Sequence, residues 1–327
     1  MPVIHHVVVP DLLGPFPASA TLPELPPLPA LSRLLSRAER NAAPVGYART
    51  LCKLFGLPVA PGQDLPTGAL SWRLNPPLAP DQWVFQAHPI HLQPDQDRLL
   101  AFDFHHQPLG LTEAEAFITL FNDHFKDEGL RLWLAEPNHW FLSVQQHPGI
   151  RTHPLSRVLG RPIEHFLPSG PDAIHWHSLL NEVQMLWHES PPNQIRAERE
   201  LPAVSGLWLS GGGCLPQAAP HQFANVSGDD HLLQGLAQLA NTRTGTRQTP
   251  SIHMLSAPGR AVLDADPTAW MVALRQLEHQ LGLLCNDEII LYPCDGQQWH
   301  WQTGRRWWRR TRPITDWMTT EIKGKNA

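Results

Sequence analysis

Asp11 is the first residue of this sequence whose type and position could do chemistry. It follows the apolar run Val3–Val9, which Pro10 ends and which predicts a buried strand of a parallel sheet. Ligands of open α/β sheets bind beyond the carboxyl ends of the strands, where a carboxylate can ligate a metal ion. The more frequent role of an aspartate after a strand is that of a turn residue without a ligand.

Three glycines, Gly211 to Gly213, follow a second predicted strand, Val204–Leu209. Glycines in this position let the backbone approach a phosphate group. The next residues contain no Gly-Lys-[Ser/Thr] and do not open a helix, so the stretch is neither a P-loop nor a dinucleotide fingerprint. A tight turn is the favoured interpretation.

The other polar residues form no motif of known chemistry. The chain has 19 histidines but no HExxH, and no Ser/His/Asp or Cys/His arrangement has a family-specific context. Asp229, Asp230 and His231 could hold a metal ion, but acidic residues also favour the start of a helix, which is their expected role. The four cysteines form no CxxC pair and are expected to be free thiols.

A segment rich in arginine and tryptophan, WHWQTGRRWWRRTRP, occupies positions 299–313. Arginine binds phosphate and tryptophan stacks on bases, which makes the segment a candidate nucleic-acid site. Its candidate contacts are Arg305, Arg306, Trp307, Trp308, Arg309 and Arg310. The favoured alternative is a pair of strands whose tryptophans pack inward below solvated arginines, because the net charge of the whole chain is -5.

The composition is that of a globular protein. Of the 327 residues, 42% are hydrophobic and 17% charged, which suffices for a sizeable core. The pI of about 6.4 argues against a general affinity for nucleic acid or an anionic membrane. The N-terminus lacks the basic region of a signal peptide, and no apolar run reaches the roughly 18 residues of a membrane span. We therefore expect a soluble cytoplasmic protein.

Predicted strands and helices alternate along the chain. The expected strands cover 3–9, 98–103, 131–134, 140–144, 204–209 and 288–293. The expected helices cover 30–41, 44–56, 112–129, 172–189, 229–241 and 267–284, with a loop over 57–82. This alternation predicts an α/β fold with a mainly parallel sheet and helices on both faces.

Several segments resemble, in chain order, the archaeal-type cofactor-independent phosphoglycerate mutases of the alkaline phosphatase superfamily. VVVPDLLG (7–14) resembles the opening strand and metal-binding turn of that family. LTEAEAFITLFNDHF and NHWFLSV, both within 111–144, resemble its helix–strand–strand stretch. The Pro-His-Asp loop of the family is resembled by PLSRVLGRPIEHFLPSG (154–170). Its Asn-x-x-Arg helix end is resembled by LLNEVQMLWHESPPNQIR (179–196), and its Trp-x-Trp-Gly-x-Gly turn by GLWLSGGG (206–213). The plan is also similar to that of the RpfE-type regulatory proteins of bacteria.

The resemblance fails at the catalytic residues of the family. The mutases form a phosphoenzyme on a Ser or Thr, and Tyr47 stands in that place after Gly46. Trp140 replaces the substrate arginine, and the metal-binding Asp-x-x-Gly-His stretch has no counterpart. A late Asp-His turn is reduced to Asp295. Two-metal phosphoryl transfer needs several carboxylates and histidines around a nucleophile, so the resemblance implies a protein that has lost catalysis.

The resemblance implies an α/β core of residues 1–70 and 200–327, truncated relative to a mutase, and a smaller α+β cap of residues 71–199. The expected function is ligand binding or regulation without a cofactor, with a phosphorylated small molecule or an unidentified protein as partner. No residue is expected to be catalytic, and the candidate ligand contacts are Asp11, Arg151, Arg157, Asn193, Arg196, Gly211 and Gly213.

Two alternatives stay open. One is a metal-dependent phosphomutase or phosphohydrolase with a rearranged site, in which Asp11 and Asp295 hold Mn or Zn. The further ligands of such a site would come from Asp229, Asp230, His231 and His253. The other alternative is nucleic-acid binding through the arginine- and tryptophan-rich segment.

Overall fold

The structure is a computed structural model that describes residues 3–318 apart from positions 15, 17–23, 60–63, 75, 80, 218–222, 224 and 241–249. The chain forms two compact units. The first consists of residues 1–59 and 218–327, and the second, residues 60–217, is inserted into it. This insert begins earlier and ends later than the 71–199 expected from the sequence, because the segments at both its ends pack on its central strand.

The first unit contains a six-stranded sheet in the order β2-β11-β10-β1-β9-β8. The strands are β1 (Ile4–Val8), β2 (Glu39–Val45), β8 (Asn225–Ser227), β9 (Ser251–Met254), β10 (Glu288–Tyr292) and β11 (Asp295–Trp301). β10, β1, β9 and β8 are parallel, whereas β11 and β2 continue the sheet antiparallel. The central place of β1 agrees with its continuous apolar run, which suits a strand buried on both faces.

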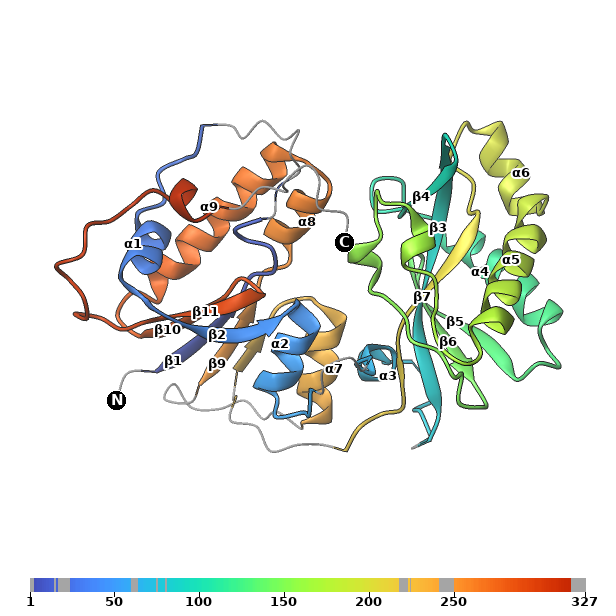
Figure 1. Ribbon diagram of the computed structural model, residues 1–327, viewed down its shortest axis with the longest axis horizontal. Helices are drawn as coiled ribbons and strands as arrows, with labels where there is room; N and C mark the ends of the chain where they lie inside the picture. The colour runs from blue at the N-terminus through green and yellow to red at the C-terminus, as the bar shows by residue number, and fades with distance from the viewer. Residues whose placement is uncertain are drawn as a thin grey trace. The chain divides into compact units, whose positions relative to one another are not determined.

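Helices cover both faces of this sheet (Figure 1). On one face lie α1 (Pro29–Arg37), α8 (Ala257–Leu263) and α9 (Pro267–Leu283). On the other lie α2 (Tyr47–Leu54) and α7 (His231–Leu239). The first unit is therefore a mixed α/β fold with a parallel-rich sheet flanked by helices, which confirms the predicted fold class.

The longest helix of this unit, α9, is well specified by its sequence. Asp266 caps it by accepting hydrogen bonds from the backbone N–H groups of Thr268 and Ala269, at 2.9 and 3.0 Å. Its buried positions Trp270, Ala273, Leu274, Leu277 and Leu281 recur at helical spacing and pack against α1 and β10. Glu278 of α9 also accepts hydrogen bonds from the backbone N–H groups of Ala30 and Leu31, at 2.7 and 3.0 Å. A carboxylate from one helix thus satisfies free donors in the first turn of another.

The second unit is built on an antiparallel sheet. Its strands are β3 (Trp83–Asp95), β4 (Arg98–Phe102), β5 (Leu130–Glu136), β6 (His139–Val144) and β7 (Gly206–Gly213). The order is β4-β3-β6-β5, and β7 pairs with β3. α4 (Leu111–His124) and α5 (Ala173–His188) pack on one face over a core rich in phenylalanine and tryptophan. α3 (Thr67–Ser71) packs on β3 and β7, and α6 (Pro191–Glu198) follows α5. No described helix is long and apolar enough to cross a membrane.

Three elements differ from the sequence prediction. β3 lies in a region without a predicted strand, because its prolines are atypical of a strand interior. Pro89 nevertheless pairs with Leu207 of β7, and Pro94 pairs with Leu99 of β4. β2 takes residues 39–45, at the junction of the two predicted helices, and its polar sequence suits an edge strand. α6 was not predicted; it begins at Pro191, soon after the end of α5, where proline fits the first turn.

Candidate functional site

The carboxyl ends of β1 and β10 bring Asp11 and Asp295 to the same edge of the first unit. The loops after these strands run side by side, since the N–H of Asp11 donates to the carbonyl of Pro293 at 3.0 Å. Asp11 and Cys294 have φ angles of 54° and 65°. Left-handed backbone is uncommon outside glycine, so both turns are tightly specified.

The electrostatics of this edge favour the protonated form of Asp11. Burial, and then the carboxylate of Asp295, raise the pKa of Asp11. Two carboxylates are nevertheless too few for a two-metal centre. Within the described part of the chain, no three His, Cys, Asp or Glu side chains converge to hold a metal ion. The described side chains at this edge therefore fall short of the ligand set of a two-metal centre.

Tyr47 occupies the start of α2 at this edge, directly after Gly46. The N–H of Gly46 donates to the carbonyl of Cys294 at 2.8 Å, which fixes the start of the helix beside the loop after β10. Burial, and then Asp230, raise the pKa of Tyr47, while burial raises the pKa of Cys294 to about 12. The hydroxyl of Thr50 donates to the carbonyl of Gly46 at 3.0 Å. These groups are therefore protonated at neutral pH and are poor nucleophiles.

Asp230 caps α7, as the sequence suggested. Its carboxylate accepts a hydrogen bond from the N–H of Leu233 at 2.9 Å, and burial raises its pKa. The adjacent Asp229 and His231 join it in no three-ligand cluster among the described residues.

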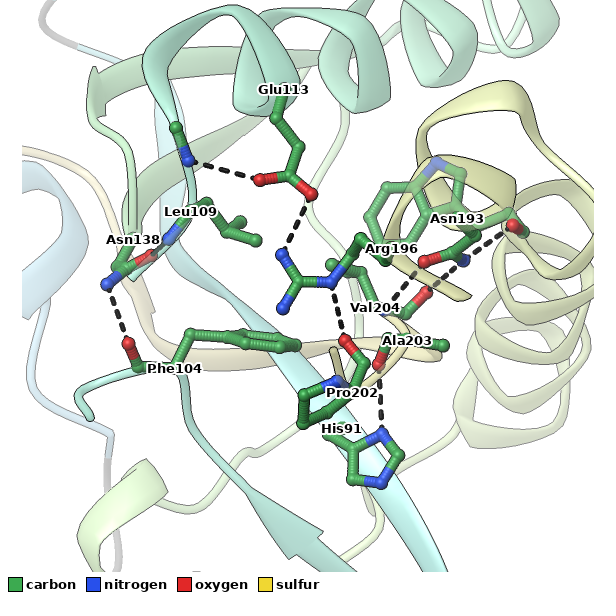
Figure 2. Close-up of polar contacts among 12 residues, drawn as sticks. His91, Phe104, Leu109, Glu113, Asn138, Asn193, Arg196, Pro202, Ala203 and Val204 are labelled. Atoms are coloured by element: carbon green, nitrogen blue, oxygen red, sulfur yellow. Dashed lines mark hydrogen bonds and ion pairs between the residues drawn. The ribbon is translucent and has the colours of Figure 1, made fainter. Parts of the chain in front are cut away.

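Two of the candidate ligand contacts, Arg196 and Asn193, are built into the interior of the second unit (Figure 2). Arg196 is 2% exposed; its Nη1 donates to Glu113 at 2.8 Å and its Nε to the carbonyl of Pro202 at 2.5 Å. The amide of Asn193 donates to the carbonyls of Trp187 and Val204 at 2.7 and 2.9 Å. These polar groups are used to hold α6 in place, and only Nη2 of Arg196 has no partner in the described structure.

Gly211 and Gly213 serve the close approach of β7 to α3. A Cβ atom on Gly211 would overlap the hydroxyl of Thr67, and one on Gly213 would lie 2.5 Å from Cβ of Pro66. Gly211 also has a φ of 62°. Packing alone explains why glycine stands at both positions.

Arg151 and Arg157 are exposed on the second unit. Arg151 borders a groove of about 370 Å³, whose lining residues include His147, Gly149, Ser169 and Gly170. The groove is braced by reciprocal backbone hydrogen bonds between Arg151 and Ser169, at 2.7 and 3.0 Å. Arg157 does not line it.

A chain of hydrogen bonds that no sequence motif indicates crosses the first sheet. Asp287 lies 3.3 Å from Nε2 of His5, whose Nδ1 lies 2.6 Å from the hydroxyl of Ser251. Ser251 continues to Nε2 of His253 at 2.8 Å, and Nδ1 of His253 reaches Ser227 at 2.7 Å. Strand pairing brings these residues together, because His5 is opposite Ser251 and Ser227 is opposite His253. Their spacing in the sequence therefore does not predict the hydrogen bonds.

This series of hydrogen bonds has the order Asp–His–Ser, but its serine is not placed to attack a substrate. Ser251 is only 3% exposed. Burial, and then His5, lower the pKa of His253 to about 4, so this ring is neutral at physiological pH. If each hydroxyl and each imidazole carries one proton, every group donates to the next in a single direction. The donation runs from Ser227 through His253, Ser251 and His5 to the carboxylate of Asp287.

Two further histidines, His6 and His88, are held neutral. His6 lies 3.0 Å from the hydroxyl of Tyr292 through Nδ1, and burial is the main cause that lowers its pKa to about 4. His88 lies 3.4 Å from the hydroxyl of Ser210 and stacks on His139; burial lowers its pKa to about 4 as well.

The tryptophans near the C-terminus divide into two groups. Trp299 and Trp301 of β11 are buried, as the strand-pair interpretation predicts, and β11 pairs with β10. The guanidinium of Arg40 lies over the ring of Trp299, 4.2 Å from its centroid. In contrast, Trp307 and Trp308 are 71% and 68% exposed.

Comparison with known proteins bears on the fold. No family model matches the chain, and no curated protein matches it in sequence. Among solved structures, the PH0037 protein from Pyrococcus horikoshii matches with a TM-score of 0.56 and 14% identity, over 93% of this chain and 88% of that one. A cofactor-independent phosphoglycerate mutase from Thermoplasma acidophilum matches with a TM-score of 0.38 and 16% identity, over 93% of this chain and 91% of that one. The first match indicates a shared fold and no more.

Proposed function

We propose that this protein is a non-catalytic relative of the cofactor-independent phosphoglycerate mutases, comparable to the RpfE-type proteins, and that it binds a phosphorylated small molecule in the cytoplasm as a regulator. The ordered segments that resemble the mutases support the kinship. The altered residues at the carboxyl edge of the first sheet support the loss of catalysis.

The observation that carries the proposal is the setting of Tyr47. A phosphoenzyme needs an activated hydroxyl, whereas burial raises the pKa of the Tyr47 phenol and so keeps it protonated. Asp230, Cys52 and Cys294 raise this pKa further, because a negative charge on any of them disfavours a phenolate. The Asp11–Asp295 pair lacks the further donors that two metal ions require.

Arg151 supports the ligand-binding half of the proposal. It lines a groove together with His147 and Ser169. Guanidinium and hydroxyl donors suit a phosphate group. Arg157 is an exposed arginine of the same unit outside the groove, and it provides a matched control.

The test combines turnover and binding. We expect no interconversion of 2- and 3-phosphoglycerate with Mn²⁺ or Zn²⁺. We also expect 3-phosphoglycerate to raise the thermal midpoint by a few degrees when its concentration exceeds Kd by about 100-fold. Arg151→Ala should abolish that shift and Arg157→Ala should retain it. Equal shifts in both variants would remove the groove from the proposal, and turnover would end the non-catalytic assignment.

The Asp11–Asp295 pair favours a second candidate function, a metal-dependent phosphomutase or phosphohydrolase with a rearranged site. A cation between the carboxylates would relieve the repulsion that contributes to the raised pKa of Asp11. Stoichiometric Mn or Zn in the purified protein, lost in Asp11→Asn together with phosphate-ester turnover, would replace the first proposal.

A further inference from the structure

Trp307 and Trp308 are large apolar side chains that the fold leaves in solvent. Their ring centroids are 6.4 Å apart and their planes are 85° to each other, so the two rings present differently oriented faces. No other described tryptophan is exposed. Since tryptophan normally contributes to a core, two adjacent exposed rings indicate a surface that contacts a partner.

The segment that carries these rings is held against α1 and β2. Nη1 of Arg306 donates to the carbonyl of Ala38 at 2.9 Å, and the backbone N–H of Arg312 donates to the hydroxyl of Ser36 at 2.8 Å. Nε of Arg37 donates to the carbonyl of Arg309 at 3.3 Å. These contacts fix the segment on both sides of the tryptophans and thereby reduce the entropic cost of binding.

The same segment concentrates positive charge on an acidic protein. Five of the eight residues at 305–312 are arginines, against a net charge of -5 for the chain. Glu39 lies 3.8 and 3.6 Å from Arg305 and Arg306 and partly offsets them. Arg309 and Arg310 are exposed and have no carboxylate within ion-pairing distance in the described structure.

We propose that residues 305–312 bind single-stranded nucleic acid, with Trp307 and Trp308 stacking on bases and Arg309 and Arg310 contacting phosphates. This activity is independent of the metabolite groove of the second unit. Stacking on tryptophan requires an exposed base face, which the bases of a duplex do not offer. Every unpaired base has such a face, so we expect binding with little preference for sequence. A membrane anchor would need a broader apolar face, but this segment contains no Leu, Ile or Phe.

The test is fluorescence anisotropy of the full chain with a labelled oligo(dT) of about 20 nucleotides, longer than a typical single site. We expect binding whose affinity falls as salt rises from about 50 to 200 mM. Trp307→Ala and Trp308→Ala should each weaken binding about tenfold, since each removes one stacking platform. Arg309→Gln with Arg310→Gln should reduce the slope of log K against log salt by about 0.7 per arginine.

Matched variants separate this surface from a general effect. Arg98→Gln with Arg199→Gln removes two exposed arginines from the second unit, and Ile174→Ala removes an exposed apolar side chain there. Both should bind as the parent does, and circular dichroism should show all variants folded. Absence of binding at low salt, full binding by the tryptophan variants, preference for a duplex of the same sequence, or tighter binding to phosphatidylglycerol vesicles would each overturn the proposal.

Discussion

Glu113 of α4 and Arg196 of α6 form an ion pair at 2.8 Å, although 83 residues separate them in the sequence. The other oxygen of Glu113 accepts a hydrogen bond from the backbone N–H of Gly110 at 3.1 Å and so completes the cap of α4. Arg196 lies over the ring of Phe104, 4.9 Å from its centroid. One carboxylate thus closes a helix and neutralises a buried guanidinium (Figure 2).

We predict that Arg196→Ala destabilises the second unit by about 3 kcal/mol, because it leaves a cavity and a carboxylate without its partner. Urea unfolding followed by circular dichroism measures the change. Glu113→Gln keeps the cap and should cost less, about 1–2 kcal/mol. The nearby exposed Arg199→Ala should change stability by less than about 0.5 kcal/mol. Equal effects for Arg196→Ala and Arg199→Ala would contradict a structural role for the pair.

We predict that Gly211→Ala destabilises the protein by about 2 kcal/mol or more, since the new methyl group meets the hydroxyl of Thr67 and the residue keeps a positive φ. Thr67→Ala in the same chain should recover part of the loss. The measurement is a double-mutant cycle in urea. No coupling between the two substitutions would indicate that Gly211 is needed for something other than contact with α3.

We predict that stability falls as the pH drops from about 6.5 to about 4. His6, His88 and His253 have folded-state pKa values of about 4, below the ordinary value of 6.5. Between these pH values the histidines are protonated in the unfolded chain but not in the folded chain. Their contribution to the free energy of unfolding is therefore fully present above pH 6.5 and is lost on acidification. Each histidine can contribute up to about 3 kcal/mol.

The check is the free energy of unfolding measured at successive pH values. His253→Gln should flatten the dependence, whereas the same change at the exposed His279 should leave it as in the parent. A stability that is constant across the window would show that these rings are protonated in the folded state.

We predict that Ser251 is structural and does not react as a nucleophile. Ser251→Ala should cost about 1–3 kcal/mol, because a buried hydroxyl that bridges His5 and His253 is removed and their ring nitrogens lose a partner. A fluorophosphonate probe should leave Ser251 unmodified, as judged by peptide mass spectrometry. Stoichiometric labelling lost in Asp287→Asn would instead reveal a working triad.

The sequence predicts best those elements whose signals are local. α9 has its cap, its proline and its apolar stripe within 18 residues, and β1 and β10 are apolar runs ended by proline. β3 is not predicted because its prolines are atypical of a strand, and its pairing with β4, β6 and β7 is a tertiary property. The same holds for the site: Asp11 and Asp295 were singled out from strand ends, but the partners of Arg196 and the chain through Ser251 depend on contacts between distant segments.

The central strand β1 has consequences for biosynthesis. Both of its neighbours, β9 and β10, come from the C-terminal part of the chain, and the cap that Glu278 gives to α1 comes from there too. A ribosome adds about 5–20 residues per second, so residues 218–292 emerge roughly 4–15 s after the inserted unit is complete. The inserted unit, residues 60–217, can therefore fold first, and both edges of β1 remain unpaired during that time. A chaperone that shields this early strand would act in that interval.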